Sequence, residues 1–94
     1  MVVTKLKAIV NKSDDQLIHQ FEKMLMERFM VSYSDNEFQV LMPQGVFKMR
    51  NRGKLIYLKL LTQNSDQLKR MILAIQNVFI EMEKGEDLVM VLDS

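Results

Sequence analysis

The sequence predicts a two-layer α+β domain in which two helices cover one face of a largely antiparallel sheet. Two stretches, residues 17–29 and 68–82, repeat apolar residues at three- and four-residue spacing, as amphipathic helices do. The stretch between them, residues 31–62, alternates apolar and polar residues and is interrupted by short turn sequences. A chain of 94 residues that is 48% hydrophobic can bury one core, so we expect a single domain over residues 1–94.

The first strand and the first helix are predicted from the N-terminal third of the chain. Residues 4–10 alternate, with Lys5 and Lys7 on the face opposite the apolar residues. Ser13 and Gln16 have the spacing of a capping box at the start of a helix. The helix that follows carries its apolar residues at Leu17, Ile18, Phe21, Met24, Leu25 and Phe29.

Four strands are predicted between the two helices, at residues 31–33, 38–42, 46–50 and 54–62. They are separated by turn sequences rich in asparagine, aspartate, proline and glycine, which are Asp35-Asn36, Pro43-Gln44-Gly45 and Asn51-Arg52-Gly53. The last strand is apolar on both faces. We expect Ile56, Leu58 and Leu60 to meet the helices.

The second helix and a final strand complete the chain. Asn64 to Gln67 are predicted to cap the helix, Lys84-Gly85 to end it, and residues 88–92 to form the strand. The order strand, helix, four strands, helix, strand favours a curved sheet of the TATA-binding-protein-like β-α-β4-α-β type. The alternative is a ferredoxin-like βαββαβ fold, in which Val31–Tyr33 is a loop.

The sequence offers little for catalysis. It has no cysteine and one histidine, His19, which is too few ligands for a histidine or cysteine metal site. The acidic residues are explained by helix starts, turns and connections, and no glycine-rich phosphate loop is present. We therefore expect no catalytic residue, metal or cofactor, and we rank an enzyme last. The absence of cysteine and of a bilayer-spanning apolar run predicts a cytoplasmic protein without a membrane partner.

Apolar residues are also predicted on the sheet face that points away from the helices. A sheet covered on one side normally carries polar residues on the other side, so an apolar patch there indicates an interface or a ligand surface. We expect a homodimer through this face in preference to a groove for a small apolar ligand. Beyond the second copy, a partner protein or a small apolar ligand is the expected binder. The candidate interface residues are Leu41, Val46, Leu55, Tyr57 and Leu61.

A basic run at the tip of the last predicted hairpin supports an alternative function. A nucleic acid or a phosphate group would meet the cations Lys48, Arg50, Arg52 and Lys54 there. The near-neutral charge of +1 and the lack of an aromatic stacking platform make a solvated turn the preferred interpretation. The main hypothesis is therefore a non-enzymatic interaction module.

The second half of the chain resembles a family of small bacterial proteins grouped as domain-of-unknown-function family 2218. The matching segments are Gly45-Val46-Phe47, Leu58-x-Leu60, Asp66-Gln67-Leu68 and Glu86-Asp87-Leu88-Val89-Met90-Val91. The resemblance implies a compact bacterial domain with no established activity. Family members carry histidines and a terminal tryptophan, but the corresponding regions here hold Met24, Glu27, Val78 and Leu92. A function that rests on those histidines is not expected in this chain.

Overall fold

The computed structural model describes residues 1–9, 15–35, 37–52, 55–82 and 89–92. Its elements in chain order are β1 (Val2–Ile9), α1 (Asp15–Arg28), β2 (Met30–Ser34), β3 (Glu37–Met42), β4 (Gly45–Arg52), β5 (Leu55–Thr62), α2 (Ser65–Glu81) and β6 (Val89–Leu92). This order confirms the predicted α+β class and the β-α-β4-α-β arrangement. Val31–Tyr33 lies inside β2, which pairs with β3, so the ferredoxin-like alternative is wrong. The predicted capping residue Ser13 and the predicted helix stop Lys84-Gly85 lie outside the described residues.

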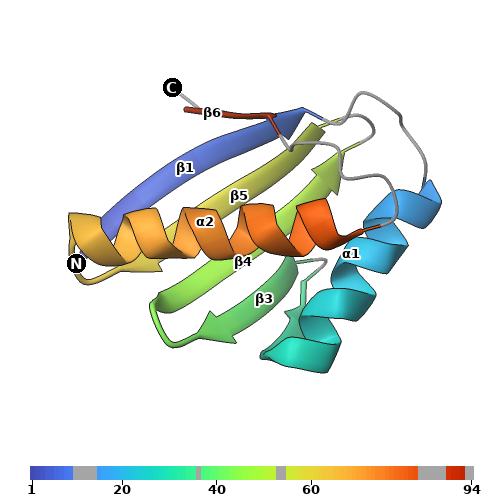
Figure 1. Ribbon diagram of the computed structural model, residues 1–94, viewed down its shortest axis with the longest axis horizontal. Helices are drawn as coiled ribbons and strands as arrows, with labels where there is room; N and C mark the ends of the chain where they lie inside the picture. The colour runs from blue at the N-terminus through green and yellow to red at the C-terminus, as the bar shows by residue number, and fades with distance from the viewer. Residues whose placement is uncertain (10–14, 36, 53–54, 83–88, 93–94) are drawn as a thin grey trace.

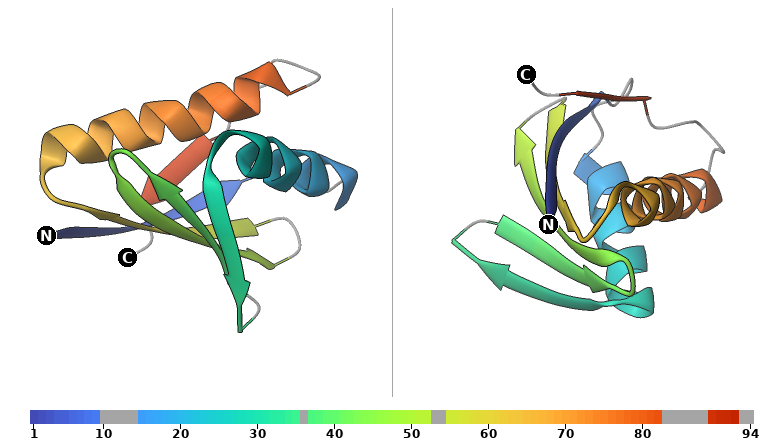
Figure 2. Two further views of the ribbon diagram at one scale, coloured as in Figure 1. Left: turned by 90° about the horizontal axis from the view of Figure 1, so that it is seen from below. Right: turned by 90° about the vertical axis from the view of Figure 1, so that its left-hand side faces the viewer.

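All of the described strands belong to one sheet, in the order β2-β3-β4-β5-β1-β6 (Figure 1). Every neighbouring pair is antiparallel. β5 lies between β4 and β1. It therefore connects the N-terminal strand with the meander formed by β2, β3, β4 and β5. Both helices lie on the same side of the sheet, which curls around them (Figure 2). The fold is therefore two layers deep, with one face of the sheet left open.

The core lies between the helices and the sheet. Ile56, Leu58 and Leu60 of β5 are buried on the helix side, as predicted. The rings of Phe21 and Phe79 join the two helices edge to face, with their centroids 5.8 Å apart. The buried apolar residues form one cluster, which contains Leu6, Ala8, Ile18, Phe21, Leu25, Phe38, Val40, Met42, Phe47, Met49, Ile56, Leu58, Leu60, Met71, Ile75, Val78, Phe79 and Met82.

The start of α2 has the predicted cap. Asn64 has an extended backbone, and its side-chain Oδ1 accepts a hydrogen bond from the backbone N–H of Gln67 at 2.9 Å. This bond satisfies one of the N–H groups that the first helical turn leaves free. Asp66 adds a negative charge to the same turn, where it favours the helix dipole.

β4 is longer than the sequence predicts. The sequence places a turn from Asn51 onward, but β4 continues to Arg52, with Asn51 opposite Ile56 and Arg52 opposite Leu55. Asparagine favours a turn locally. The pairing with the full length of β5 overrides that preference, because each added residue completes another part of the ladder.

The turn between β3 and β4 depends on the glycine at its end. Met42 and Gly45 are paired, so Pro43 and Gln44 form a two-residue connection. Gly45 has a φ of +151°, and a Cβ atom at this position would collide with the carbonyl oxygen of Leu61 on β5. Glycine is therefore required both for the backbone angle and for the close approach of the two strands.

We expect Gly45→Ala to lower the free energy of unfolding by more than about 2 kcal/mol, because the methyl group meets the Leu61 carbonyl in a strained backbone conformation. Urea unfolding followed by circular dichroism measures the loss. Pro43→Ala, in the same turn but exposed, is the control and should cost no more than about 1 kcal/mol. Equal stability of Gly45→Ala and the wild type would contradict the account of this turn.

Candidate functional site

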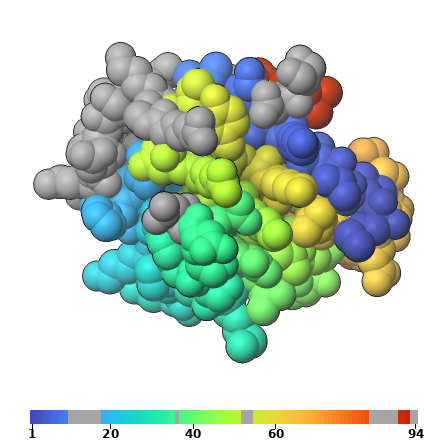
Figure 3. Space-filling model, turned by 180° about the vertical axis from the view of Figure 1, so that it is seen from behind, coloured from blue at the N-terminus to red at the C-terminus, as the bar shows by residue number. Residues whose placement is uncertain are grey.

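The sheet face that points away from the helices, called the open face from here on, is the candidate site. Figure 3 views the molecule from this side, and strand residues coloured green, yellow and dark blue form much of the visible surface. Side chains on this face come from alternate residues of each strand. The antiparallel register then decides which of them stand side by side, so the face can be followed row by row across the strands.

One row of the open face is apolar across five strands. Met30 is opposite Leu41, Leu41 opposite Val46, Val46 opposite Leu61, and Leu61 opposite Val3. Directly opposite side chains in an antiparallel sheet are in contact range. These five residues are called the apolar row.

The next row along the strands is cationic. Lys48 of β4 is opposite Lys59 of β5, and Lys59 is opposite Lys5 of β1. Gln39 and Ser32 continue the same row on β3 and β2. Like charges directly opposite each other on a sheet are destabilising, so the three lysines cost stability in the free protein. They are called the lysine row.

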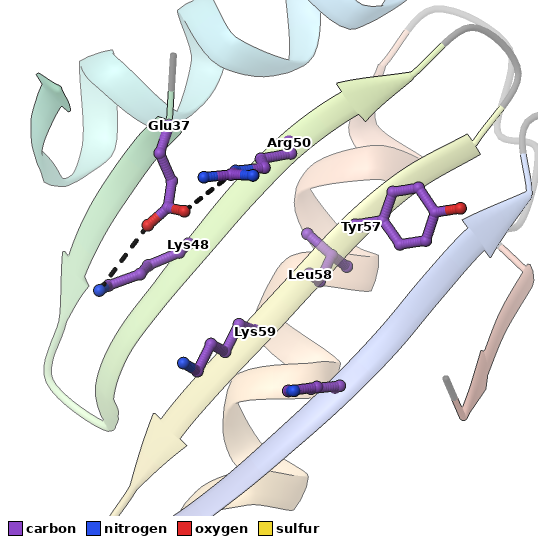
Figure 4. A pocket seen from close by; sticks show the side chains of 7 residues that line it. Glu37, Lys48, Arg50, Tyr57, Leu58 and Lys59 are labelled. Atoms are coloured by element: carbon purple, nitrogen blue, oxygen red, sulfur yellow. Dashed lines mark hydrogen bonds and ion pairs between the residues drawn. The ribbon is translucent and has the colours of Figure 1, made fainter. Parts of the chain in front are cut away.

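A third row contains the acidic residue that partly neutralises this face. The carboxylate of Glu37 lies 3.2 Å from Nε of Arg50 and 3.7 Å from Nζ of Lys48, as the dashed lines in Figure 4 show. Arg50 is in turn opposite Tyr57 on β5. Among the described residues, neither Lys5 nor Lys59 has an acidic partner. Glu37 therefore compensates the charges of Arg50 and Lys48, but not those of Lys5 and Lys59.

A shallow depression lies over the lysine row. Its volume is about 150 Å³. It is lined by Lys5, Glu37, Lys48, Arg50, Tyr57, Leu58 and Lys59, and Figure 4 labels all of these except Lys5. Pockets for drug-sized molecules enclose roughly 300–1,000 Å³. The depression is too small for such a ligand, but a carboxylate or a phosphate group fits this volume and this charge.

The predicted apolar interface is divided in the structure. Leu41, Val46 and Leu61 come together in the apolar row. Leu55 and Tyr57 are on the same open face but further along β5, with Lys59 of the lysine row between Tyr57 and Leu61. The five predicted residues thus share a face without forming one continuous apolar patch.

The predicted basic tip is also rearranged. Lys48 and Arg50 lie within β4, opposite Lys59 and Tyr57, and contribute to the open face instead of to the end of a hairpin. The side chain of Arg52 and the whole of Lys54 lie outside the described residues. Sequence reasoning missed Lys5 and Lys59 as members of the cationic group. The sequence does distinguish Lys59, because it is the one charged residue within 55–62. Only the strand register, however, identifies its neighbours.

The described polar residues outside the open face include a histidine on α1 and an ion pair between the two helices. His19 is exposed on α1. Burial raises the pKa of Glu22, and the charge of the nearby His19 partly opposes this effect. The described residues contain no group of three or more His, Cys, Asp and Glu side chains that could hold a metal ion. Arg28 of α1 forms an ion pair with Glu81 of α2, which joins the ends of the two helices.

Neither of the described helices is long and apolar enough to cross a membrane.

The lysine row leads to a stability prediction. Lys59→Glu should raise the free energy of unfolding by about 1 kcal/mol at low salt, because it replaces two repulsive cross-strand pairs with two attractive ones. The gain should shrink in concentrated salt, which screens exposed charges. Urea unfolding at both salt concentrations measures it. Lys23→Glu on α1 changes the charge equally and should give no gain, since Glu27 lies one helical turn away. A destabilised Lys59→Glu protein would show that the lysines do not repel one another.

No family model matches the sequence, and no curated protein matches it. The fold is similar to the NMR structure of PA4090 from Pseudomonas aeruginosa, with a TM-score of 0.66 over 99% of this chain and 96% of that chain. The two sequences are 12% identical, so the likeness shows the fold alone. The resemblance to family 2218 stays a prediction.

Proposed function

We propose that this protein is a non-catalytic binding module whose open face takes an acidic segment of a partner protein. The observation that carries the proposal is the lysine row, in which Lys5 and Lys59 stand side by side without an acidic partner among the described residues. Bound carboxylates would relieve the repulsion within the row. Charge complementarity of this kind steers association and selects partners.

The apolar row favours a protein segment over a nucleic acid. It runs beside the lysine row from Met30 to Val3, so a partner with alternating acidic and apolar side chains would match both rows. A nucleic-acid surface combines a strong basic excess with several aromatic platforms. This chain has a net charge of +1, and Tyr57 is the aromatic residue that lines the depression. Nucleic acid is therefore the second candidate.

The lysine row also argues against the predicted homodimer through the open face. In a symmetric face-to-face dimer the same patch of both copies meets itself. The lysine row crosses the face on β4, β5 and β1, so a two-fold axis that runs along or across this row would bring the lysines of the two copies together. Juxtaposed like charges at an interface cost several kcal/mol. An acidic partner avoids this cost.

The test is a titration of a fluorescently labelled peptide that alternates glutamate and leucine, followed by fluorescence anisotropy. The double variant Lys5→Gln/Lys59→Gln should bind roughly two- to thirty-fold more weakly at low salt, since each exposed ion pair contributes about 0.2–1 kcal/mol. The matched control is Lys23→Gln/Lys69→Gln, which removes two exposed lysines from the helices and should bind as the wild type does. Added salt should weaken peptide binding by the wild type more than peptide binding by the Lys5→Gln/Lys59→Gln variant.

Equal loss of peptide binding in both double variants would overturn the proposal, because binding would then follow net charge and not the lysine row. So would the absence of wild-type binding at low salt. A single-stranded DNA oligonucleotide and inorganic phosphate are titrated alongside. Tighter binding of either one than of the peptide would replace the acidic segment with that ligand and overturn the choice of a protein partner.

A further inference from the structure

β2 is an edge strand with an accessible backbone. It pairs with β3 on one side and ends the sheet on the other (Figure 2). Its side chains are mostly outside the core: Met30 is 74% and Tyr33 is 66% exposed, and Ser32 and Ser34 are exposed as well. In an antiparallel strand, alternate residues direct their N–H and C=O groups away from the neighbouring strand. The outer side of β2 therefore presents hydrogen-bonding groups that none of the described strands pairs.

The sequence of β2 lacks the features that normally protect such an edge. Natural edge strands carry lysine, proline or a bulge, which prevents another strand from pairing with them. Residues 30–34 read Met-Val-Ser-Tyr-Ser, with no charge, proline or glycine. All five residues are paired with β3 in regular register, without a bulge. The edge is thus regular, uncharged and suited to accept a further strand.

We propose that β2 pairs antiparallel with β2 of a second copy of this chain, so that one continuous sheet runs through both copies. An isologous interface requires that the patch complement itself about a two-fold axis. Full overlap of the five residues places Ser32 opposite the partner's Ser32, and Val31 opposite the partner's Tyr33. Within each pair the two side chains lie on the same face of the sheet, as directly opposite residues of an antiparallel pair must.

The side chains in this register favour the pairing. Val31 and Tyr33 form an aromatic–β-branched cross-strand pair, a combination that stabilises antiparallel sheets, and the two-fold axis repeats it. Tyr33 already packs edge to face on Phe38, with ring centroids 6.0 Å apart, so its ring is held in place beside the edge.

A second copy fits this edge without opposing the lysine rows. In the paired sheet the lysine row of each copy is separated from the axis by Gln39 and Ser32 of β3 and β2. Both open faces point to the same side, so they stay free for an acidic segment. The edge pairing does not rest on the proposed function, and peptide binding and self-association can fail independently.

Cross-linking through an introduced cysteine tests the register, because the chain has no cysteine of its own. Opposite residues of an antiparallel pair have Cα atoms about 4.5–5.5 Å apart, within reach of a disulfide. Under mild oxidation Ser32→Cys should form a covalent dimer at least about tenfold faster than Ser34→Cys or Ser65→Cys, since pairing makes the reaction intramolecular. Ser34 is an edge control, and Ser65 lies at the start of α2.

Sedimentation equilibrium tests the association itself. The wild type should form dimers as its concentration rises toward about 1 mM, the range in which a small interface is expected to associate. Tyr57→Glu on the open face should leave the dimer intact. A wild type that stays monomeric would overturn the proposal, and so would equal cross-linking rates for the three cysteine variants. Dissociation by Tyr57→Glu would assign the dimer to the open face instead.

Discussion

The pairing of β5 with β1 and β4 is the interaction on which the rest of the structure depends. Even-numbered residues of β5 lie buried beneath the helices, while its odd-numbered residues lie on the open face. Because side chains alternate along a strand, a slip of one residue against either neighbour would exchange the two sets. The burial of Ile56, Leu58 and Leu60 therefore also fixes where Lys59 lies. The core determines the composition of the site on the opposite side of the same strands.

Much of the fold could be predicted because hydrophobic periodicity is a local property. The spacing of Leu68, Met71 and Ile75 indicates both the helix and its buried side, and Asn64 indicates where that helix starts. The alternation around Phe38 and Phe47 assigns faces to the strands. These signals need only neighbouring residues, so they can be interpreted without knowledge of the rest of the chain.

The arrangement of the site could not be predicted in the same way. Periodicity assigns Lys59 and Tyr57 to a face, but it does not say which residue of β1 or β4 stands beside each of them. Lys5 and Lys59 are far apart in the sequence, and only the register of β1 against β5 makes them neighbours. The same limit explains why the sequence predicts one patch that contains both Leu55 and Leu61. Turn preferences were misleading at Asn51, where pairing with β5 extends the strand.

The position of β1 has a consequence for how the chain reaches its native state. Its two neighbours, β5 and β6, both come from the second half of the chain: Val2 pairs with Thr62, and Leu6 pairs with Leu92. β1 is made before either of them and has no local strand with which to form a hairpin. β1 can pair only when these long loops close, and closing them costs entropy. Pairs between residues so far apart in the sequence raise the contact order of the domain and slow its folding. The meander from β2 to β5 is joined by short connections and can begin to pair without β1.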